Sequence, residues 1–114
     1  MTDCLFCKIA GGDIPAELLY EDEQVVAFAD IAPQAPTHLL IIPREHIPTL
    51  NDLNADNAAL VGHIALVAKQ LAAEHGLADD GYRLIMNCNE HGGQTVFHLH
   101  CHLMGGRPLK WPPG

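Results

Sequence analysis

The chain has 114 residues and carries 6 Lys and Arg against 14 Asp and Glu, for a formal net charge of −8. This length fits one domain over residues 1–114, and the negative charge opposes binding to the phosphate backbone of a long nucleic acid. No apolar run approaches the roughly 20 residues that span a bilayer. The N-terminus lacks the basic and apolar regions of a secretion signal, so we expect a cytoplasmic protein with no membrane partner.

The first motif along the chain is the pair Cys4 and Cys7, whose Cys-x-x-Cys spacing suits Zn²⁺. Two thiolates and two histidines would make a closed tetrahedral structural site. Disulfides are rare in a reducing compartment, so the alternative is a pair of buried thiols. The pair alone leaves both interpretations open.

Two short strands are predicted next, over Leu18–Tyr20 and Val25–Asp30, around the acidic turn at residues 21–24. The continuous apolar runs His38–Ile42, which ends at Pro43, and Tyr82–Cys88 predict two central strands. A long helix is predicted between these two runs, with Asn54 as its cap and Gly76 as its stop. Its apolar residues recur at helical spacing: Leu60, Ile64, Val67 and Leu71.

Three histidines then alternate with apolar residues at the end of the chain. His98, His100 and His102 lie between Phe97, Leu99, Cys101 and Leu103. Because strand side chains alternate between faces, the imidazoles are expected on one face and the apolar partners in the core. The elements sum to an α+β fold, a five-stranded and mostly antiparallel sheet packed with one long helix and a short N-terminal helix.

The loop Asn89–Thr95 leads directly into the histidines and predicts an anion pocket, because its glycines can bring several backbone N–H groups to one point. Neutral imidazole can attack phosphorus near pH 7, and a neighbouring imidazolium can donate a proton to the departing group. Histidines two apart on a strand can equally bind one Zn²⁺ with an open position. Phosphoryl or nucleotidyl transfer and a zinc hydrolase that uses all three histidines as ligands are therefore both open.

The segment His98–Leu103 resembles the His-φ-His-φ-His-φ signature of the histidine-triad (HIT) family. Segments 30–38 and 42–47 are also similar to the family, and segments 105–107 and 111–114 resemble its nucleotide-binding Hint branch. The resemblance implies a HIT-like fold and a homodimer whose subunits join their sheets, with the tail 105–114 contributing to the dimer.

The same resemblance implies binding of purine nucleoside monophosphates such as AMP and hydrolysis of the P–N bond of nucleoside 5′-phosphoramidates. In this chain His100 matches the nucleophile that becomes nucleotidylated, His102 a donor to the phosphate and leaving group, and His38 a fourth histidine near the site. The other implied nucleotide contacts are Phe28 and Ile31 for the base, which are expected to be buried, Asp30 for the ribose, and Asn87, Gly93, Gln94 and Thr95 around the phosphate and sugar.

The resemblance also implies a structural zinc site, because some relatives with this N-terminal pattern bind zinc through residues that match Cys4, Cys7, His46 and His98. His98 then has a structural role besides its place among the catalytic histidines, and the chemistry itself requires no cofactor. Two alternatives to a phosphoramidase remain: a nucleotide-sensing or partner-binding module with little turnover, and a dinucleoside polyphosphate hydrolase.

Overall fold

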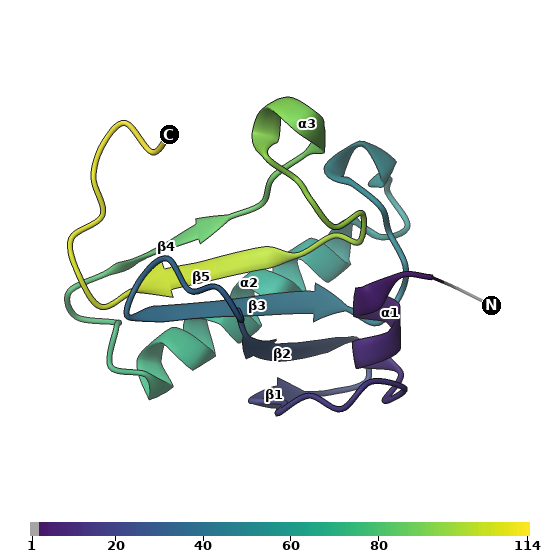
Figure 1. Cartoon of the computed structure of the whole chain (residues 1–114), viewed down its shortest axis with the longest axis horizontal. Coiled ribbons are helices and arrows are strands. Elements are labelled where there is room, and N and C mark those ends of the chain that lie inside the picture. Colours follow the sequence, from purple (N-terminus) through teal and green to yellow (C-terminus); the bar gives the residue numbers. More distant parts are fainter. Residues whose placement is uncertain (1–2) are drawn as a thin grey trace.

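The computed structural model describes residues 3–114, in which a five-stranded sheet has the order β1-β2-β3-β5-β4 and every neighbouring pair is antiparallel (Figure 1). The strands are β1 (Tyr20–Glu21), β2 (Val25–Ala29), β3 (Thr37–Pro43), β4 (Tyr82–Ile85) and β5 (Cys101–Gly105). The helices are α1 (Leu5–Ala10), η1 (Leu50–Asp52), α2 (Ala58–Glu74) and α3 (Asn89–Gly92). The predicted α+β class, with one long helix and a short N-terminal one, is confirmed.

The two faces of the sheet have different coverings. In the β3–β5 register Leu39 pairs with Leu103, while Leu40 pairs with His102, so the first pair lies on one face and the second pair on the other. Helix α2 covers the face of Leu39 and Leu103. The face of His102 is therefore left for α1 and the site.

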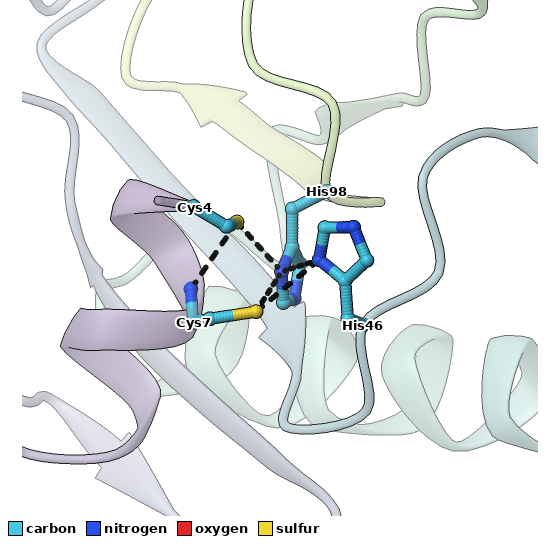
Figure 2. A group of neighbouring side chains, drawn as sticks. All are labelled: Cys4, Cys7, His46 and His98. Atoms are coloured by element: carbon cyan, nitrogen blue, oxygen red, sulfur yellow. Dashed lines mark hydrogen bonds between the residues drawn. The ribbon is translucent and has the colours of Figure 1, made fainter. Parts of the chain in front are cut away.

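Helix α1 packs on this second face through a small apolar cluster. Phe6 and Ala10 of α1 are buried there, against strand residues of β2 and β3 that comprise Val26, Phe28, Leu40 and Ile42. Cys4 and Cys7 point from the same helix toward His46 and His98 (Figure 2). One short helix thus contacts both the sheet and two histidines.

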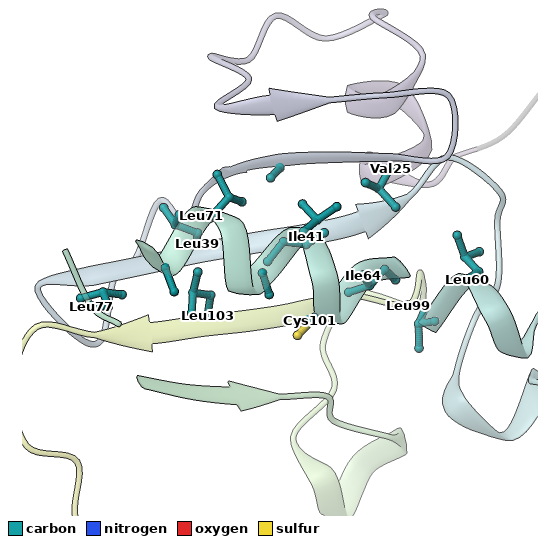
Figure 3. Packing of buried hydrophobic residues seen from close by; sticks show 14 of the residues in the cluster. Val25, Leu39, Ile41, Leu60, Ile64, Leu71, Leu77, Leu99, Cys101 and Leu103 are labelled. Atoms are coloured by element: carbon teal, nitrogen blue, oxygen red, sulfur yellow. The ribbon is translucent and has the colours of Figure 1, made fainter. Parts of the chain in front are cut away.

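The principal core lies between α2 and the first face (Figure 3). The helix contributes the predicted apolar series, and Leu60, Ile64, Val67 and Leu71 are all buried. Cys101 and Leu103 of β5 and the preceding Leu99 pack in the same cluster. Within residues 3–114 no helix is long and apolar enough to cross a bilayer.

The turn between β1 and β2 is tied to α2 by Asp22. Its Oδ1 accepts the backbone N–H groups of Gln24 and Val25, and its Oδ2 lies 2.9 Å from the Tyr20 hydroxyl and 2.7 Å from His63 Nε2. Burial alone would raise the pKa of Asp22, but these hydrogen bonds hold it below its ordinary value. Asp22 therefore gives this acidic turn a structural role, because it links the turn to α2.

Some predicted boundaries were wrong. Strand β4 is an edge strand and ends at Ile85, rather than a central strand running to Cys88. Helix α2 begins after Asn57, because the Asn54 side chain accepts backbone N–H groups of a preceding turn instead. The predicted stop at Gly76 agrees with its left-handed φ of 74°.

The histidine segment is only partly a strand. Strand β5 begins at Cys101, because the N–H of Leu99 donates to the carbonyl of Ile47, 2.6 Å away, which lies outside the sheet. Phe97 is 51% exposed rather than in the core. The alternation of faces still holds from Leu99 onward, since Leu99, Cys101 and Leu103 are buried in the α2 core.

Two glycines give a matched test of this fold. Gly62→Ala, in the middle of α2 with nothing within 4 Å of the new Cβ, should raise the free energy of unfolding by up to about 1 kcal/mol. Gly106→Ala should lower it by about 2 kcal/mol or more, because its φ is 97° and the new Cβ would lie 2.8 Å from Pro36 Cβ. Urea denaturation measures both, and equal effects would contradict the predicted backbone conformation at Gly106.

Candidate active site

His100 is held by a backbone carbonyl. Its Nδ1 lies 2.7 Å from the carbonyl oxygen of His98, and because a carbonyl only accepts, Nδ1 carries the proton. The lone pair of the neutral ring is therefore on Nε2. The ring is buried, as is the ring of His98. A neutral imidazole with its nucleophilic nitrogen chosen by the backbone is suited to attack an electrophile.

His102 is oriented by a chain of donors that starts in the β2–β3 loop. The N–H of Gln34 donates to His38 Nδ1 over 3.0 Å, so in neutral His38 the proton is on Nε2. That nitrogen donates to His102 Nδ1, 2.8 Å away, which leaves His102 with an Nε2–H. Asp30 Oδ2 lies 3.4 Å from His38 Nε2. The chain therefore aligns a donor, His102 Nε2–H, next to the His100 ring, whose centre is 5.0 Å away.

Burial and, to a smaller extent, the neighbouring His100 and His38 lower the pKa of His102 to about 4, while the nearby Asp30 carboxylate opposes this shift. His102 is therefore neutral at pH 7. The sequence analysis expects an imidazolium as proton donor, but His102 is not in that form in the ligand-free protein. A nearby anion would raise its pKa and so allow the imidazolium to form.

Cys4, Cys7, His46 and His98 form a second cluster on the α1 side (Figure 2). His98 Nδ1 lies 3.3 Å from Cys4 Sγ, 3.4 Å from Cys7 Sγ and 3.3 Å from His46 Nδ1. A tetrahedral zinc ion with bonds of about 2.3 Å to sulfur and 2.0 Å to nitrogen sets two nitrogens about 3.3 Å apart, a nitrogen and a sulfur about 3.5 Å apart and two sulfurs about 3.8 Å apart. The spacing therefore fits zinc without rearrangement.

The tautomer of His98 also fits a metal. Its Nε2 lies 2.7 Å from the carbonyl of Pro43 and so carries the proton, which leaves the Nδ1 lone pair directed at the thiols. A backbone acceptor on the far nitrogen is the usual support of a ligating histidine. Burial lowers the pKa of His98, with the nearby His46 adding to this effect, although the bond to Pro43 opposes it. The neutral ring that a metal requires is thus favoured.

Asp30, His38 and His102 are also close enough to hold a cation, but the hydrogen bonds argue against it. Because His38 Nδ1 accepts the N–H of Gln34, its Nε2 carries a proton and has no lone pair to offer a metal. The arrangement suits a proton-sharing pair instead. Among residues 3–114, no candidate metal group contains His98, His100 and His102 together, so the three-histidine zinc site of the sequence analysis has no counterpart.

The loop before the histidines differs from the predicted glycine turn. Residues 89–92 form a single helical turn, α3, which Gly93 ends with a φ of 83°. The Gln94 side chain is buried, accepts the N–H of Asn89 and donates to the carbonyls of Pro48 and Val96. Gln94 thus shapes the loop. Gly93 and Thr95, the neighbours of Gln94 in sequence, are exposed, and Asn87 is half-buried.

The residues expected to contact the base and the ribose differ in their burial and hydrogen bonds. Phe28 is buried on β2, as predicted. Ile31 is 100% exposed, so its predicted burial was wrong: it follows the end of β2 and lies in the loop before β3. Asp30 Oδ1 accepts the N–H of Ala32, 2.8 Å away, and its Oδ2 lies beside His38. Asp30 is therefore both a turn residue and a neighbour of the histidine pair.

Phe6 is a site residue that the sequence analysis missed. Its ring meets the His100 ring edge to face, with centres 5.1 Å apart and planes at 90°, and it also contacts Phe28 at 5.7 Å and His98 at 6.0 Å. The available signal was its position between Cys4 and Cys7, because zinc ligation by these cysteines places Phe6 near His98.

The fold and the site together define an α+β protein with a backbone-oriented histidine beside a histidine N–H donor. Residues 3–108 match the family described as "Scavenger mRNA decapping enzyme C-term binding". The chain is 53% identical over 107 residues to the purine nucleoside phosphoramidase of Escherichia coli strain K12, covering 94% of this chain and 90% of that protein. The chain belongs to the histidine-triad family.

Solved structures of similar proteins support the same family assignment. A HIT family hydrolase from Legionella pneumophila has a TM-score of 0.96 and 57% identity, covering 98% of this chain and 100% of that one. A histidine triad protein from Clostridium difficile has a TM-score of 0.93 and 44% identity, covering 96% of each chain. The family and the HIT-like fold that the sequence resemblance implied are confirmed.

The deduced tautomers can be measured. Long-range ¹H–¹⁵N spectra of the ring nitrogens at pH 7 should show Nδ1–H for His100 and Nε2–H for His102, because a backbone carbonyl and His38 fix them. On acidification His102 should stay neutral until about pH 4. The ring signals of exposed His91 on α3 serve as an internal reference for the assignment. An Nε2–H signal for His100 would contradict the site geometry.

Proposed function

We propose that this protein is a hydrolase that cleaves the P–N bond of purine nucleoside 5′-phosphoramidates through a nucleotidyl intermediate on His100. The observation that carries the proposal is the hydrogen bond from His100 Nδ1 to the His98 carbonyl, which directs the lone pair of Nε2 away from the backbone. Similarity to a purine nucleoside phosphoramidase over nearly the whole chain supports the choice of substrate.

In the first step His100 Nε2 attacks phosphorus, the N–P bond to the histidine forms and the P–N bond of the substrate breaks. The electron pair of the broken bond goes to the leaving nitrogen, which takes a proton from His102. A neutral His102 cannot supply that proton without becoming an anion, so it must first take one up. The negative charge of the bound phosphate favours this uptake, which adds the proton to His102 Nδ1 and turns the His38 Nε2–H from His102 toward Asp30 Oδ2, 3.4 Å away.

In the second step water attacks the same phosphorus and gives a proton to His102, now neutral and able to accept it. The bond between phosphorus and His100 Nε2 breaks, and its electron pair returns to the ring. The ring is positively charged while it carries the nucleotide, and the carbonyl of His98, 2.7 Å from Nδ1, stabilises that charge.

The remaining contacts are those that the family resemblance implies, with Phe6 added from the structure. We assign Asp30 to the ribose hydroxyls, since a carboxylate can accept from both, and Phe28 with Phe6 to the purine ring. Asn87, Gly93 and Thr95 are assigned to phosphate and sugar, with Gln94 acting through the loop that it holds. Ile31 contributes to the base pocket only if a ligand or a second subunit covers it.

We assign zinc to the site of Cys4, Cys7, His46 and His98, with a structural role. When bound, zinc would supply rigidity by joining α1 to the loop after β3 and to the segment before β5. The hydrolytic steps above use only the chain's own groups. A reducing compartment, the cytoplasm, would keep both cysteines as thiolate ligands.

The nucleophile is tested by hydrolysis of adenosine 5′-phosphoramidate with the wild type and with His100→Ala. We expect the variant to lose on the order of a thousandfold or more in kcat/KM, as expected for removal of a nucleophile. Intact mass after a rapid acid quench should reveal a nucleotidyl adduct on the wild type only. His91→Ala, an exposed histidine of α3, is the matched control.

If His100→Ala is as active as the wild type, His100 is not the nucleophile and the mechanism fails. If the wild type binds AMP without turnover, the protein is a nucleotide-sensing module. Faster cleavage of diadenosine tetraphosphate than of the phosphoramidate would instead assign it to dinucleoside polyphosphate hydrolysis.

We further propose a homodimer that pairs β4 with β4. Strand β4 is an edge of the sheet, and unpaired edges with exposed apolar side chains favour pairing. Tyr82 and Leu84 are exposed on β4, and Leu66 of α2, 63% exposed, lies in the same surface depression as Tyr82. Exposed Trp111 lies in the tail, which a hydrogen bond from Arg83 to Lys110 attaches to β4.

The dimer is tested with Leu84→Lys, which places a charge on the proposed interface. We expect the variant to elute at half the mass of the wild type in size-exclusion chromatography with light scattering, because a buried lysine opposes edge pairing. Leu19→Lys, a comparably exposed leucine before β1, is the control and should stay dimeric. A wild type that is monomeric at micromolar concentration would contradict the proposal.

A further inference from the structure

Helix α1 has two faces that serve two different sites. One face carries Cys7 and continues in the N-cap residue Cys4, and the sulfur atoms of both lie within 3.4 Å of histidine nitrogens. The other carries Phe6, which is 5% exposed and packs on His100 and Phe28. The metal cluster and the nucleotide pocket are therefore joined by a helix of six residues.

This helix depends on tertiary contacts for its position. A helix of six residues is far below the length that is stable alone in water. Its anchors are the burial of Phe6 and Ala10, one hydrogen bond from Arg44 to the carbonyl of Ala10, and the cluster of Cys4 and Cys7 with His46 and His98. A metal in that cluster replaces weak thiol contacts by bonds to two separate loops, so it fixes Phe6 against the pocket.

His98 is a second connection between the two sites. Its ring points Nδ1 into the metal cluster, while its backbone carbonyl accepts from His100 Nδ1. The same residue therefore contacts the metal with its side chain and orients the nucleophile with its main chain. A shift of His98 moves the acceptor on which the direction of His100 Nε2 depends.

We propose that metal binding at the Cys4, Cys7, His46 and His98 cluster and nucleotide binding at His100 are positively coupled, with Phe6 as the positioning residue that links them. The proposal rests on the proposed function, because it requires that a nucleotide occupies the pocket beside His100. Linkage then requires the effect to be reciprocal: zinc tightens nucleotide binding, and nucleotide tightens zinc binding by the same factor.

The test measures both affinities on the full chain. The dissociation constant of AMP is measured by titration calorimetry with zinc-loaded and with chelator-stripped protein, and that of zinc by competition with a chromophoric chelator, with and without AMP. We expect a change on the order of tenfold, equal in the two experiments. Hydrogen exchange of the α1 amides should slow on zinc binding, which reports the helix directly and not the activity.

Phe6→Leu separates coupling from simple loss of contact. It weakens AMP binding in both metal states, but the ratio of the two dissociation constants should fall toward one, because this ratio measures the interaction alone. Phe97→Leu, which changes an exposed ring, is the matched control and should keep the wild-type ratio. Should the stripped protein lose its fold, zinc release from the loaded protein should still be slower with AMP than without it, and Phe6→Leu should remove this difference.

Each other outcome overturns a stated part. If AMP and zinc both bind, yet neither changes the affinity of the other, the coupling is wrong while the proposed hydrolysis stands. If zinc-loaded protein fails to bind AMP, both the coupling and the proposed function are wrong. If the purified protein binds no zinc, the metal site and the coupling are wrong, and hydrolysis by His100 is unaffected.

Discussion

The site depends on the burial of one side of a single segment. Leu99, Cys101 and Leu103 are packed against α2, and because extended residues alternate between faces, this burial directs the neighbouring histidines to the other side of the sheet. Burying three apolar side chains contributes several kcal/mol, far more than an imidazole gains or loses by changing face. The core of the protein therefore sets the direction of its chemistry.

Three backbone groups then decide which ring nitrogen of each histidine carries the proton. The carbonyl of Pro43 fixes the proton of His98, the carbonyl of His98 fixes that of His100, and the N–H of Gln34 acts on His102 through His38. Three histidines two residues apart thus present three different groups: a lone pair that faces the cysteine and histidine cluster, a lone pair on His100 Nε2 and an N–H donor. Sequence spacing places the rings, whereas the backbone groups that they meet decide which nitrogen of each ring carries the proton.

This division explains what the sequence could predict. The sheet, the long helix and the buried face of the histidine segment follow from local periodicity, and the prediction succeeded there. Ile31, Phe97 and the edge position of β4 depend on where loops run and which strands become neighbours, which periodicity does not encode. Phe6 was missed because the periodicity of a short helix does not indicate which ring an apolar residue will meet, and only its position between Cys4 and Cys7 pointed toward His98. The contacts assigned to Asn87, Gly93 and Thr95 remain predictions.

The low pKa of His102 means that the ligand-free pocket has no charged His102 to attract an anion at neutral pH, on a protein whose formal net charge is −8. Such a pocket has little attraction for inorganic phosphate, an abundant competitor for any site built to hold a phosphoryl group. Affinity has to come from the base and the ribose before the charge on His102 develops. Because His102 is uncharged in the free protein, the nucleoside has to be recognised before the phosphate is bound tightly. The site therefore selects its ligand by the base and the ribose, which do not react.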